Sequence, residues 1–335
     1  MIDVSILGAG FMGRTHAAAW KSLAGRSRVR RVYSRSLQRA AEIAGAVGAE
    51  PVTDLATATR ECDAVDICLP TDLHRAAAEA AFAAGKHVLL EKPIALTSYD
   101  ADAILSAAER SGKLLMVGLV LRFWAEYVEL GRRTAAGELG EPLCVATHRL
   151  SPPADWNDWL RDPARSGGVP VDLMVHDFDQ MNRIFGRPHR VFARPAVQTA
   201  QHIVATVDYD GGAGIAEGSM IMPRAYPFSS AIRVVCERGA AEYSFRALPP
   251  AGGGNIGSVD PLSGRLLLYR EGAEPEAVSL GGGDPWAAEI SAFVACIEAG
   301  RPPEEGSGQQ ARAALLVALA ANRSLESGRP EPVGA

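Results

Sequence analysis

The sequence lacks the features by which membrane-bound and exported proteins are recognised. No apolar run approaches the roughly 18 continuous residues that a transmembrane helix needs. No basic segment precedes the first apolar run, because residues 1–3 lead directly into the apolar residues 4–7, a pattern typical of a strand and not of a signal peptide. We therefore expect a cytoplasmic protein with no membrane partner.

Metal-ligand spacing and an excess of positive charge are also missing. The cysteines, at positions 62, 68, 144, 236 and 296, form no CxxC or similar pair, and an odd number of unpatterned cysteines indicates reduced thiols. The net charge is −5, so the chain lacks the basic face that nucleic acid phosphates require. We expect neither a structural metal nor a nucleic-acid partner.

What is present indicates two domains. The chain has 335 residues, 47% of them apolar, which is enough for two cores, since a domain takes about 100–200 residues. Up to residue 120, short apolar strands alternate with helices, which predicts a doubly wound parallel sheet. The strands are expected at 4–7, 29–33, 64–69, 87–90 and 114–118, and the helices at 13–23, 37–47, 73–84 and 99–111.

After residue 120 the pattern changes to β-rich runs separated by glycine and proline, which predicts a large, mostly antiparallel open sheet. The runs are expected at 145–150, 190–197, 202–209, 214–222, 232–237, 241–245 and 266–269, with helices at 126–136, 171–185, 285–299 and 309–327 and loops at 252–254 and 281–283. We therefore expect an α/β domain at 1–120 and an α+β domain at 121–335.

A glycine motif follows the first strand. Residues 8–13 read G-A-G-F-M-G, a G-x-G-x-x-G between a strand and a helix. Gly8 permits the tight turn, Gly10 lets the backbone approach a pyrophosphate, and Gly13 lets the helix pack on the strand. The phosphates would then meet free N–H groups at the start of the helix, near Phe11 and Met12. The alternative is a purely structural turn, but the context favours an NAD(P)-binding Rossmann domain.

The end of the second strand bears on the choice of cofactor. NAD enzymes typically place an Asp or Glu there to bind the ribose 2′-OH, and this sequence has Ser34-Arg35-Ser36 instead. A hydroxyl beside a guanidinium suits a 2′-phosphate, which favours NADP over NAD. The alternative is that Ser36 only caps the following helix while Arg35 points into water.

Lys92, in the tripeptide Glu91-Lys92-Pro93, directly follows the strand at 87–90. Ligands of open α/β sheets bind beyond the carboxyl ends of the strands, so Lys92 is expected where the nicotinamide and its substrate would meet. Most lysines are solvated surface charges, which is the alternative here, but the place at a strand end favours a functional role.

A second cluster lies in residues 166–179, S-G-G-V-P-V-D-L-M-V-H-D-F-D. Asp172 and His176 are four residues apart, which places them on one face of a helix, and Asp179, three residues further on, could hydrogen-bond the imidazole. A histidine beside a carboxylate suits general acid–base catalysis near neutral pH. A buried structural His–Asp pair is the alternative, and a metal site is disfavoured because no further ligands cluster here.

Together these residues resemble the Gfo/Idh/MocA oxidoreductase family, named for glucose-fructose oxidoreductase and inositol dehydrogenase. The resemblance rests on the glycine motif, on A-G-K-H-V-L-L-E-K-P at 84–93 and on residues 167–179. W-L-R-D-P at 159–163 and G-L-V-L-R-F at 118–123 add to it. The match extends from residue 1 to about residue 190.

The resemblance implies reversible hydride transfer between NAD(P) and a secondary alcohol of a sugar or cyclitol. The family's catalytic lysine corresponds to Lys92, which would stabilise the developing alkoxide. His176 would take the hydroxyl proton, and Asp172 would bind a neighbouring hydroxyl. The expected cofactor contacts are Gly8, Gly10, Phe11, Met12, Gly13, Ser34, Arg35, Leu69, Pro70, Thr71, His74, Glu91, Lys92 and Arg122, and the expected substrate contacts are Lys92, Arg122, Trp159, Arg161, Asp172 and His176.

Two positions depart from the family pattern. The usual T-P-N after the third main strand is Pro70-Thr71-Asp72 here, and Val169 replaces the third glycine after Ser-Gly-Gly. Both leave the predicted catalytic residues in place. His16, on the helix after the glycine motif, is expected to be structural. Trp156, with Trp159, could wall the pocket or simply pack in the core.

Two other functions stay open from the residues alone. The same side chains would serve an NAD-assisted epimerase, lyase or hydrolase on this fold. A non-catalytic dinucleotide-binding regulator is the weaker alternative, because it would be expected to lack Lys92, Asp172 or His176, and all three are present.

The predicted sheet of the second domain bears on assembly. The face that helices would not cover still carries apolar residues such as Val204, Ile215 and Val234 or their alternates. A sheet that is apolar on both faces needs a second cover. We therefore expect a homodimer, or a homotetramer as family members often form.

Overall fold

The computed structural model describes residues 1–154, 158–196, 198–247 and 264–334. They form two compact units: unit 1 is residues 1–124 with 283–312, and unit 2 is residues 125–282 with 313–335. The segment 283–312 therefore groups with the first unit, and not with residues 121–335 as expected from the linear division. No helix in the described part of the chain is long and apolar enough to cross a bilayer.

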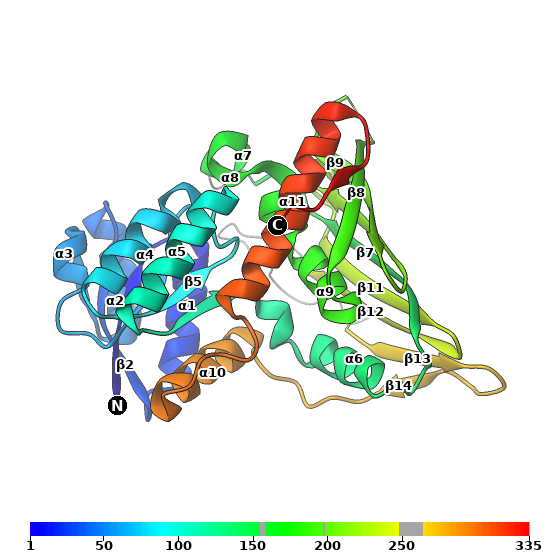
Figure 1. The fold of residues 1–335 in the computed structure, drawn as a ribbon. Helices are drawn as coiled ribbons and strands as arrows, with labels where there is room; N and C mark the ends of the chain where they lie inside the picture. The colour runs from blue at the N-terminus through cyan, green and yellow to red at the C-terminus, as the bar shows by residue number, and fades with distance from the viewer. Residues whose placement is uncertain (155–157, 197, 248–263, 335) are drawn as a thin grey trace. The chain divides into compact units, whose positions relative to one another are not determined.

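Unit 1 contains a six-stranded sheet in which all neighbouring strands are parallel (Figure 1). Its strand order, β3-β2-β1-β4-β5-β6, is that of a Rossmann fold, which confirms the predicted doubly wound sheet. The strands are β1 Ile2–Leu7, β2 Ser27–Tyr33, β3 Glu50–Val52, β4 Ala64–Ile67, β5 His87–Glu91 and β6 Leu115–Gly118. The helices are α1 Phe11–Ser22, α2 Leu37–Val47, α3 Leu55–Ala58, α4 His74–Ala83, α5 Ser98–Ser111 and α10 Pro285–Ala299.

Both faces of this sheet are packed. On one face, Val4 and Ile6 of β1 and Leu89 of β5 share a core with residues of α1, α2 and α10. Strand residues of the opposite parity, such as Leu90, are equally buried, and α4, which packs against α5, contacts β4 and β5. The strands are therefore apolar on both sides, as a parallel sheet covered by two helical layers requires.

Unit 2 contains a nine-stranded sheet in the order β14-β13-β12-β11-β7-β10-β9-β8-β15. Among its neighbouring pairs only β7 and β10 are parallel, which confirms the predicted, mostly antiparallel sheet. The strands are β7 Pro142–Leu150, β8 Pro188–Pro195, β9 His202–Tyr209, β10 Ala213–Ser219, β11 Phe228–Cys236, β12 Gly239–Ala247, β13 Leu266–Arg270, β14 Glu276–Val278 and β15 Glu331–Pro332. The loop expected at 252–254 and the strand end expected at Val197 lie outside the described residues.

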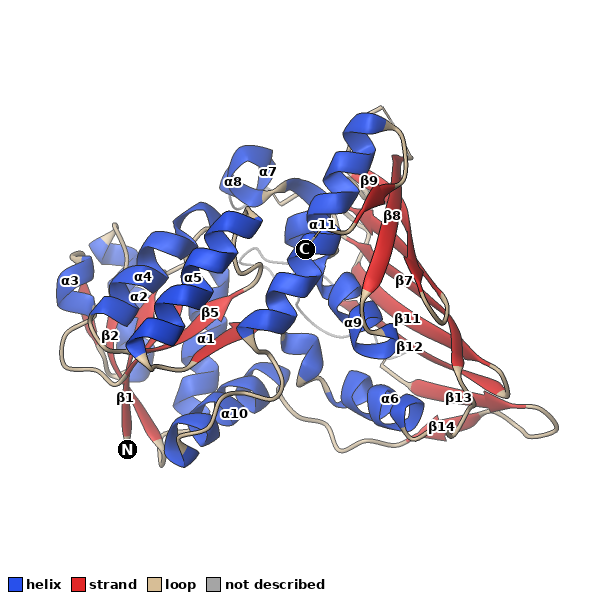
Figure 2. Ribbon diagram, in the orientation of Figure 1, coloured by secondary structure: helices blue, strands red, loops and turns tan. Residues whose placement is uncertain are grey.

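The helices of unit 2 lie on one side of its sheet (Figure 2). They are α6 Ala125–Ala135, α9 Val175–Phe185 and the part of α11, Gly308–Ser327, that follows residue 312, while α7 Asp158–Arg161 and α8 Pro163–Ser166 precede α9. Contacts join α9 to β7 and β10, and α6 to β12. This side of the sheet therefore builds the core of unit 2.

The other side of the sheet carries no helix from the described ranges (Figure 2). The pairing of β9 with β10 places Val204 and Ile215 on this open face, where they are 41% and 42% exposed. Val234 is instead fully buried, and its alternate Val235 is 37% exposed. The expectation for Val234 itself was wrong, because successive residues of a strand point to opposite faces and Val234 falls on the helix side.

Unit 1 also encloses a carboxyl group on α10. None of the surface of Glu289 is exposed, and its carboxylate oxygens have no hydrogen-bond partner among the described residues. Burial raises the pKa of Glu289 well above its ordinary value, and the charges of Glu91 and Asp66 add to this change while His16 opposes it. We therefore expect a neutral carboxylic acid in the folded chain.

Glu289→Gln should alter how stability depends on pH. The folded chain holds a proton on Glu289 that the unfolded chain releases above about pH 4.5, its ordinary pKa. The contribution of Glu289 to the free energy of unfolding should thus be fully present below that pH and fall as the pH rises toward the raised pKa of the folded state. Glu289→Gln should lessen this fall, which urea denaturation over a pH series would measure. An identical pH dependence in both proteins would contradict the assignment.

Candidate active site

The three glycines of the turn between β1 and α1 have different surroundings. Gly8 has a φ of 120°, and a Cβ there would lie 2.3 Å from the carbonyl oxygen of Cys68. A Cβ on Gly13 would lie 2.0 Å from the carbonyl oxygen of Gly8. Packing therefore requires both glycines. Around a Cβ on Gly10, by contrast, nothing lies within 4 Å, so the missing side chain leaves open space.

This open space adjoins the N-terminus of α1 and fits the phosphates of a dinucleotide. Within α1, the N–H of Arg14 donates to the carbonyl of Gly10, so the N–H groups of Phe11, Met12 and Gly13 must find partners outside the helix. The first turn of α1, which is fully described, contains no acidic residue, and Gly10 provides no side-chain cap. Free donors without a competing carboxylate suit an anionic pyrophosphate.

The residues predicted to choose the cofactor lie at the end of β2. The hydroxyl of Ser36 caps α2 by accepting from the N–H of Arg39 at 3.4 Å. The hydroxyl of Ser34 accepts from the N–H of Ser36 at 3.2 Å, and Arg35 is exposed. Capping by Ser36 thus agrees with the alternative interpretation, while the strand end still lacks the carboxylate typical of NAD enzymes.

The other residues predicted for the cofactor site follow β4 and β5. Residues 69–71 follow β4 after Cys68, and Thr71 opens a 3-10 turn that leads into α4. Lys92 is half-buried directly after β5. Because β1, β4 and β5 are adjacent and parallel, these segments and Gly8 lie at one edge of the sheet, where open α/β sheets bind ligands.

His74 joins the ends of β4 and β5. Its imidazole is buried, with Nδ1 2.9 Å from the carbonyl oxygen of Pro93 and Nε2 2.9 Å from that of Leu69. Burial lowers the pKa of His74, and its contacts with the carbonyl groups oppose that change. Both ring nitrogens therefore contact the strand ends on which the cofactor site is expected.

His16 lies in a buried polar network. Its Nδ1 is 2.9 Å from Oδ2 of Asp66, and its Nε2 is 3.0 Å from Oε1 of Glu91. The indole N–H of Trp20 donates to the same Asp66 oxygen at 2.7 Å. Burial disfavours the imidazolium, but the negative charge of Asp66, with Cys68, outweighs it and raises the pKa of His16 well above its ordinary value. These contacts agree with the structural role expected of His16.

His16, Asp66 and Cys68 have the composition of a metal site but the spacing of a hydrogen-bonded group. The Nδ1 atom of His16 lies 3.1 and 2.9 Å from the two oxygens of Asp66, and the thiol of Cys68 lies 3.5 Å from Oδ1. Such distances are those of direct hydrogen bonds. Burial also raises the pKa of the Cys68 thiol, which disfavours the thiolate that a metal would bind.

Arg122, predicted to contact both cofactor and substrate, lies in the 3-10 turn Val120–Arg122 after β6. It is buried and forms an ion pair with Glu305 of the segment 283–312. Sequence reasoning missed Glu305, because no local pattern connects two residues that are 183 positions apart. Part of the hydrogen-bonding capacity of Arg122 is thus used within unit 1.

In unit 2, the continuous helix expected at 171–185 is interrupted. Val169–Leu173 forms a π-helix, closed by a hydrogen bond of 3.0 Å from the N–H of Met174 to the carbonyl of Val169, and α9 follows. Asp172 therefore lies in the π-helix and His176 in the first turn of α9. The expectation of a single α-helix across both residues was wrong, because a π-helix precedes α9; that the two side chains share a face stays a prediction.

Glycines lead into this irregular turn. Gly167 and Gly168 have φ values of 79° and 74°, a conformation that disfavours other residues. A Cβ on Gly167 would also lie 2.5 Å from the side chain of Val171. Asp172 is buried, whereas His176 is partly exposed and can meet a ligand. Single π-turns occur often at functional sites, which agrees with the predicted catalytic role.

A buried ion pair holds the start of α9 on the sheet. Arg149 of β7 donates from Nε and Nη2 to the carboxylate of Asp177 at 3.0 and 3.2 Å, and both side chains are buried. Gly218 of β10 leaves room for Met174, since a Cβ there would lie 2.5 Å from that side chain. These contacts fix the turn that carries His176. Sequence reasoning missed them, although a charged residue inside a strand pattern was a usable signal.

The remaining residues predicted for the pocket have varied surroundings. Arg161 is exposed and pairs with an aspartate of α7, the helix in which Trp159 is partly buried. Asp179 is buried and accepts a hydrogen bond from the side chain of Gln180 at 3.3 Å. Trp156 lies outside the described residues.

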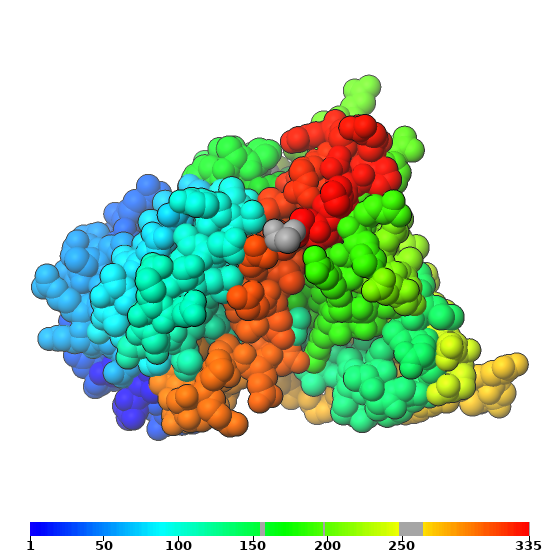
Figure 3. Space-filling model, in the orientation of Figure 1, coloured from blue at the N-terminus to red at the C-terminus, as the bar shows by residue number. Residues whose placement is uncertain are grey.

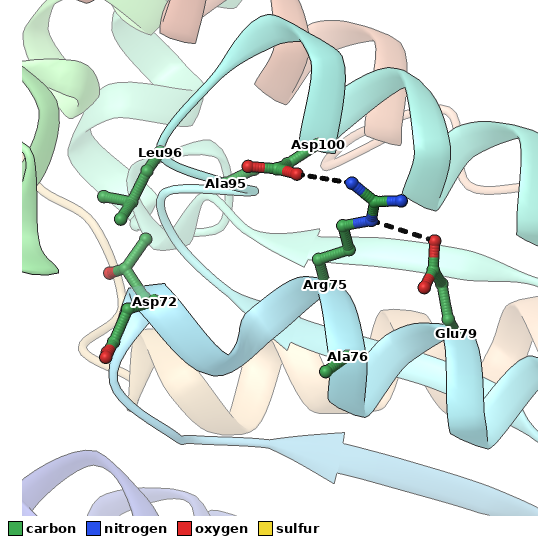
Figure 4. A pocket seen from close by; sticks show the side chains of 8 residues that line it. Asp72, Arg75, Ala76, Glu79, Ala95, Leu96 and Asp100 are labelled. Atoms are coloured by element: carbon green, nitrogen blue, oxygen red, sulfur yellow. Dashed lines mark hydrogen bonds and ion pairs between the residues drawn. The ribbon is translucent and has the colours of Figure 1, made fainter.

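A pocket of about 350 Å³, lined by charged and apolar residues, lies beside α4 in unit 1 (Figure 4). In it, Arg75 pairs with Glu79 at 3.1 Å and with Asp100 at 2.8 Å, so its charge is already neutralised. Of the residues that line this pocket, only Thr71 belongs to the predicted cofactor contacts. We therefore assign this pocket no part in catalysis.

Gly10→Ala and Gly13→Ala should have opposite effects on binding and stability. The added methyl group at position 10 has room in the protein but projects into the proposed phosphate site, so NAD(P) affinity should fall at least about 10-fold with little change in stability. The methyl group at position 13 meets backbone and should destabilise unit 1. Calorimetric titration and thermal unfolding of both variants measure this. Unchanged affinity in Gly10→Ala would exclude the phosphate site.

Lys92 belongs to unit 1, whereas Asp172 and His176 belong to unit 2. Each unit thus carries its own part of the predicted catalytic set. That the two parts act on one substrate carbon stays a prediction.

Known proteins resemble the chain along most of its length. The family model described as "Oxidoreductase family, NAD-binding Rossmann fold" matches residues 2–119, and the model described as "GFO/IDH/MocA C-terminal domain" matches residues 127–242. An inositol 2-dehydrogenase of Rhizobium meliloti strain 1021 is 31% identical over 98% of both chains. A UDP-N-acetylglucosamine 3-dehydrogenase of Acidithiobacillus ferrooxidans is 30% identical over 89% of both chains.

A solved structure agrees with these sequence matches. UDP-N-acetylglucosamine 3-dehydrogenase GnnA from Acidithiobacillus ferrooxidans superposes with a TM-score of 0.81 at 27% identity, covering 97% of this chain and 98% of that chain. The chain therefore belongs to the Gfo/Idh/MocA family and is an oxidoreductase with an NAD(P)-binding Rossmann domain.

Proposed function

We propose that the chain is an NAD(P)-dependent dehydrogenase acting on a secondary alcohol, or the corresponding ketone, of a sugar, sugar derivative or cyclitol such as inositol. The observation that carries the proposal is the open space at Gly10, before the N-terminus of α1, at the sheet edge that also bears Lys92. The names of two relatives, an inositol 2-dehydrogenase and a UDP-N-acetylglucosamine 3-dehydrogenase, support a polyhydroxylated substrate.

Three side chains share the chemistry in this proposal. The bound nicotinamide supplies the acceptor or donor of the hydride. During oxidation His176 accepts the proton of the reacting hydroxyl, and the Lys92 ammonium stabilises the negative charge that develops on its oxygen. Asp172 accepts a hydrogen bond from a neighbouring hydroxyl, which orients the substrate ring.

Lys92→Ala and His176→Ala should each lower kcat by at least about 100-fold, the usual scale for groups that transfer protons or stabilise charge. NAD(P) binding should persist, because the phosphates contact the backbone of residues 8–13. In the unaltered protein, alcohol oxidation should weaken at acid pH, since a protonated imidazole accepts no proton, and His176→Ala should lack this acid limb.

The measurement needs a substrate, which a panel of sugars and cyclitols screened with both cofactors would identify. His189→Ala is a matched control, because His189 is an exposed histidine of unit 2 whose Nε2 pairs with Asp210 at 2.7 Å. Near-normal turnover of both Lys92→Ala and His176→Ala on a genuine substrate would refute the assigned roles.

We further propose that NADP is preferred over NAD. The hydroxyl of Ser34 and the exposed guanidinium of Arg35 stand where NAD enzymes place a carboxylate, and both can donate to a 2′-phosphate. The exposure of Arg35 leaves it available for such a contact.

Arg35→Ala should weaken the binding of NADP and leave that of NAD nearly unchanged, because only NADP carries the 2′-phosphate. Calorimetric titration of both cofactors against both proteins measures the difference. Equal or tighter binding of NAD by the unaltered protein would defeat the proposed preference.

The open face of the sheet in unit 2 supports assembly into a homodimer or homotetramer. Val204 and Ile215 are exposed on the neighbouring strands β9 and β10 of this face, and Val235 is exposed on β11, which β7 separates from β10. Water-exposed apolar residues on a broad sheet are typical of an interface. We propose that two copies pair through this face.

Ile215→Glu together with Val204→Lys should shift the assembly toward the monomer, because charges buried between two sheets would be desolvated. Light scattering at several concentrations gives the mass of the assembly. A monomer mass for the unaltered protein would refute the proposal. An oligomer mass that stays unchanged in the double variant would refute it as well.

A further inference from the structure

Lys92 is flanked by two buried histidines from different helices of unit 1. His16 belongs to α1, and His74 is the first residue of α4. Each imidazole bridges the chain at the end of β4 to the chain at the end of β5, and each makes contact through both of its ring nitrogens. The residues they contact on the β5 side are the immediate neighbours of Lys92.

On the N-terminal side of Lys92, the contacts form a continuous chain. Nε2 of His16 lies 3.0 Å from Oε1 of Glu91, and the other oxygen of Glu91 accepts the backbone N–H of Lys92 at 2.9 Å. Nδ1 of His16 is anchored on Asp66 at 2.9 Å. The backbone nitrogen of Lys92 is thus linked through one carboxylate and one imidazole to the middle of the sheet.

On the C-terminal side, a second imidazole holds the residue after Lys92. Nδ1 of His74 lies 2.9 Å from the carbonyl oxygen of Pro93, and Nε2 lies 2.9 Å from the carbonyl oxygen of Leu69. Only 1% of the surface of His74 is exposed, so water does not compete strongly for the N–H that a neutral imidazole can donate to one of these two carbonyl oxygens.

Two of the acidic groups around His16, Asp66 and Glu91, favour the bridge. Asp66 and Cys68 face it from the end of β4, Glu91 faces it from β5, and Glu289 faces it from α10. Asp66 is hydrogen-bonded to Nδ1 of His16, whereas Glu91 lies at ion-pair distance from Nε2, which has no hydrogen-bond partner among the described residues. An imidazolium at this place is therefore stabilised by a charge-assisted hydrogen bond on one side and by an ion pair on the other.

We infer that His16 and His74 are positioning residues for Lys92, which fix the backbone on its two sides, at Glu91 and at Pro93. The inference rests on the catalytic role proposed for Lys92. The ammonium of Lys92 reaches the substrate from the backbone that Glu91 and Pro93 hold, so a shift of that backbone moves the starting point of the side chain. A displacement of about 1 Å can lower the rate about 100-fold.

Substitution of each histidine by Asn and by Gln distinguishes the contact made by Nδ1 from the contact made by Nε2. The amide nitrogen of asparagine lies near the place of Nδ1, and that of glutamine near the place of Nε2. At position 16, Gln can keep the contact to Glu91, whereas Asn keeps only the contact to Asp66. At position 74 the order reverses, since Asn can keep the contact to Pro93 and Gln keeps only the contact to Leu69.

The two pairs should therefore give a crossed pattern. We expect His16→Asn and His74→Gln to lower kcat about 10- to 100-fold, with little change in the KM for the cofactor, while His16→Gln and His74→Asn stay closer to the unaltered protein. Both variants at position 16 lose the imidazolium, so charge alone cannot separate them. If the histidines had only a structural role, the loss of kcat would follow the loss of thermal stability. Thermal unfolding of all four variants therefore has to be measured beside kcat.

Labelling of the lysines gives a readout that needs neither substrate nor cofactor. The chain has four lysines, Lys21, Lys86, Lys92 and Lys113. Competitive acetylation with acetic anhydride, analysed by peptide mass spectrometry, should show a higher reactivity of Lys92 in His16→Asn and His74→Gln only, because a less restrained ammonium is more accessible. The other three lysines are internal references, and His202→Asn and His202→Gln in unit 2 are control variants.

The crossed pattern in labelling would support the inference whether or not dehydrogenase activity is found. An absence of dehydrogenase activity would reject only the proposed function. Equal labelling and equal kcat for Asn and Gln at each position would overturn the inference. Should His16→Asn fail to fold, Glu91→Gln interrupts the same chain, and unchanged Lys92 reactivity in that folded variant would overturn it as well.

Discussion

The imidazole of His16, enclosed between two carboxylates, is the interaction on which the geometry of the cofactor-binding unit depends. It joins α1 to β4 through Asp66 and to β5 through Glu91. Removing one partner from such a buried group leaves an uncompensated charge, at a cost of about 3–5 kcal/mol. A slip of β4 by one residue would also turn Asp66 to the other face of the sheet. The network thus specifies the register of the strands whose ends carry the site.

Close backbone approach is the second constraint, and both units use glycine to achieve it. In unit 1, Gly8 and Gly13 let the start of α1 lie against the end of β1, which directs the helix N-terminus toward the expected phosphates. In unit 2, Gly218 lets Met174 lie on β10, and Gly167 admits Val171. The direction of the α1 N-terminus and the irregular turn that bears Asp172 both depend on these missing side chains.

Much of this architecture was predictable, because strong local periodicity identifies element types. The ranges of α2, β9 and α10 agree with the sequence to the residue. β3 and α3 were missed, since segments of three and four residues contain no full period. The π-helix at Val169–Leu173 was also missed, because an extra residue in a helical turn leaves no signature in the local composition. Its formation depends on how the turn packs in the folded chain.

The candidate site was predictable where function uses local motifs, and less so where it uses partners distant in sequence. The glycines and the Glu91-Lys92-Pro93 segment are recognisable in isolation, whereas Arg149 and Asp177 meet only after the sheet forms. Asp66 offered a signal, an acid inside an apolar strand, since a buried charge needs a partner. The partner's identity was not available from spacing, because it lies 50 residues away.

The segment 283–312 shows why a linear division into domains fails for this chain. Ile290, Phe293 and Val294 of α10 complete the core over α1 and β1, so residues 1–124 alone would expose an apolar face. The same segment brings Glu289 toward the His16 network and Glu305 to Arg122. Burial of these apolar side chains therefore fixes where the segment packs on unit 1. The packed segment in turn places Glu289 near His16 and Glu305 against Arg122. Unit 1, which carries the expected cofactor site, is therefore complete only when residues 283–312 pack on residues 1–124.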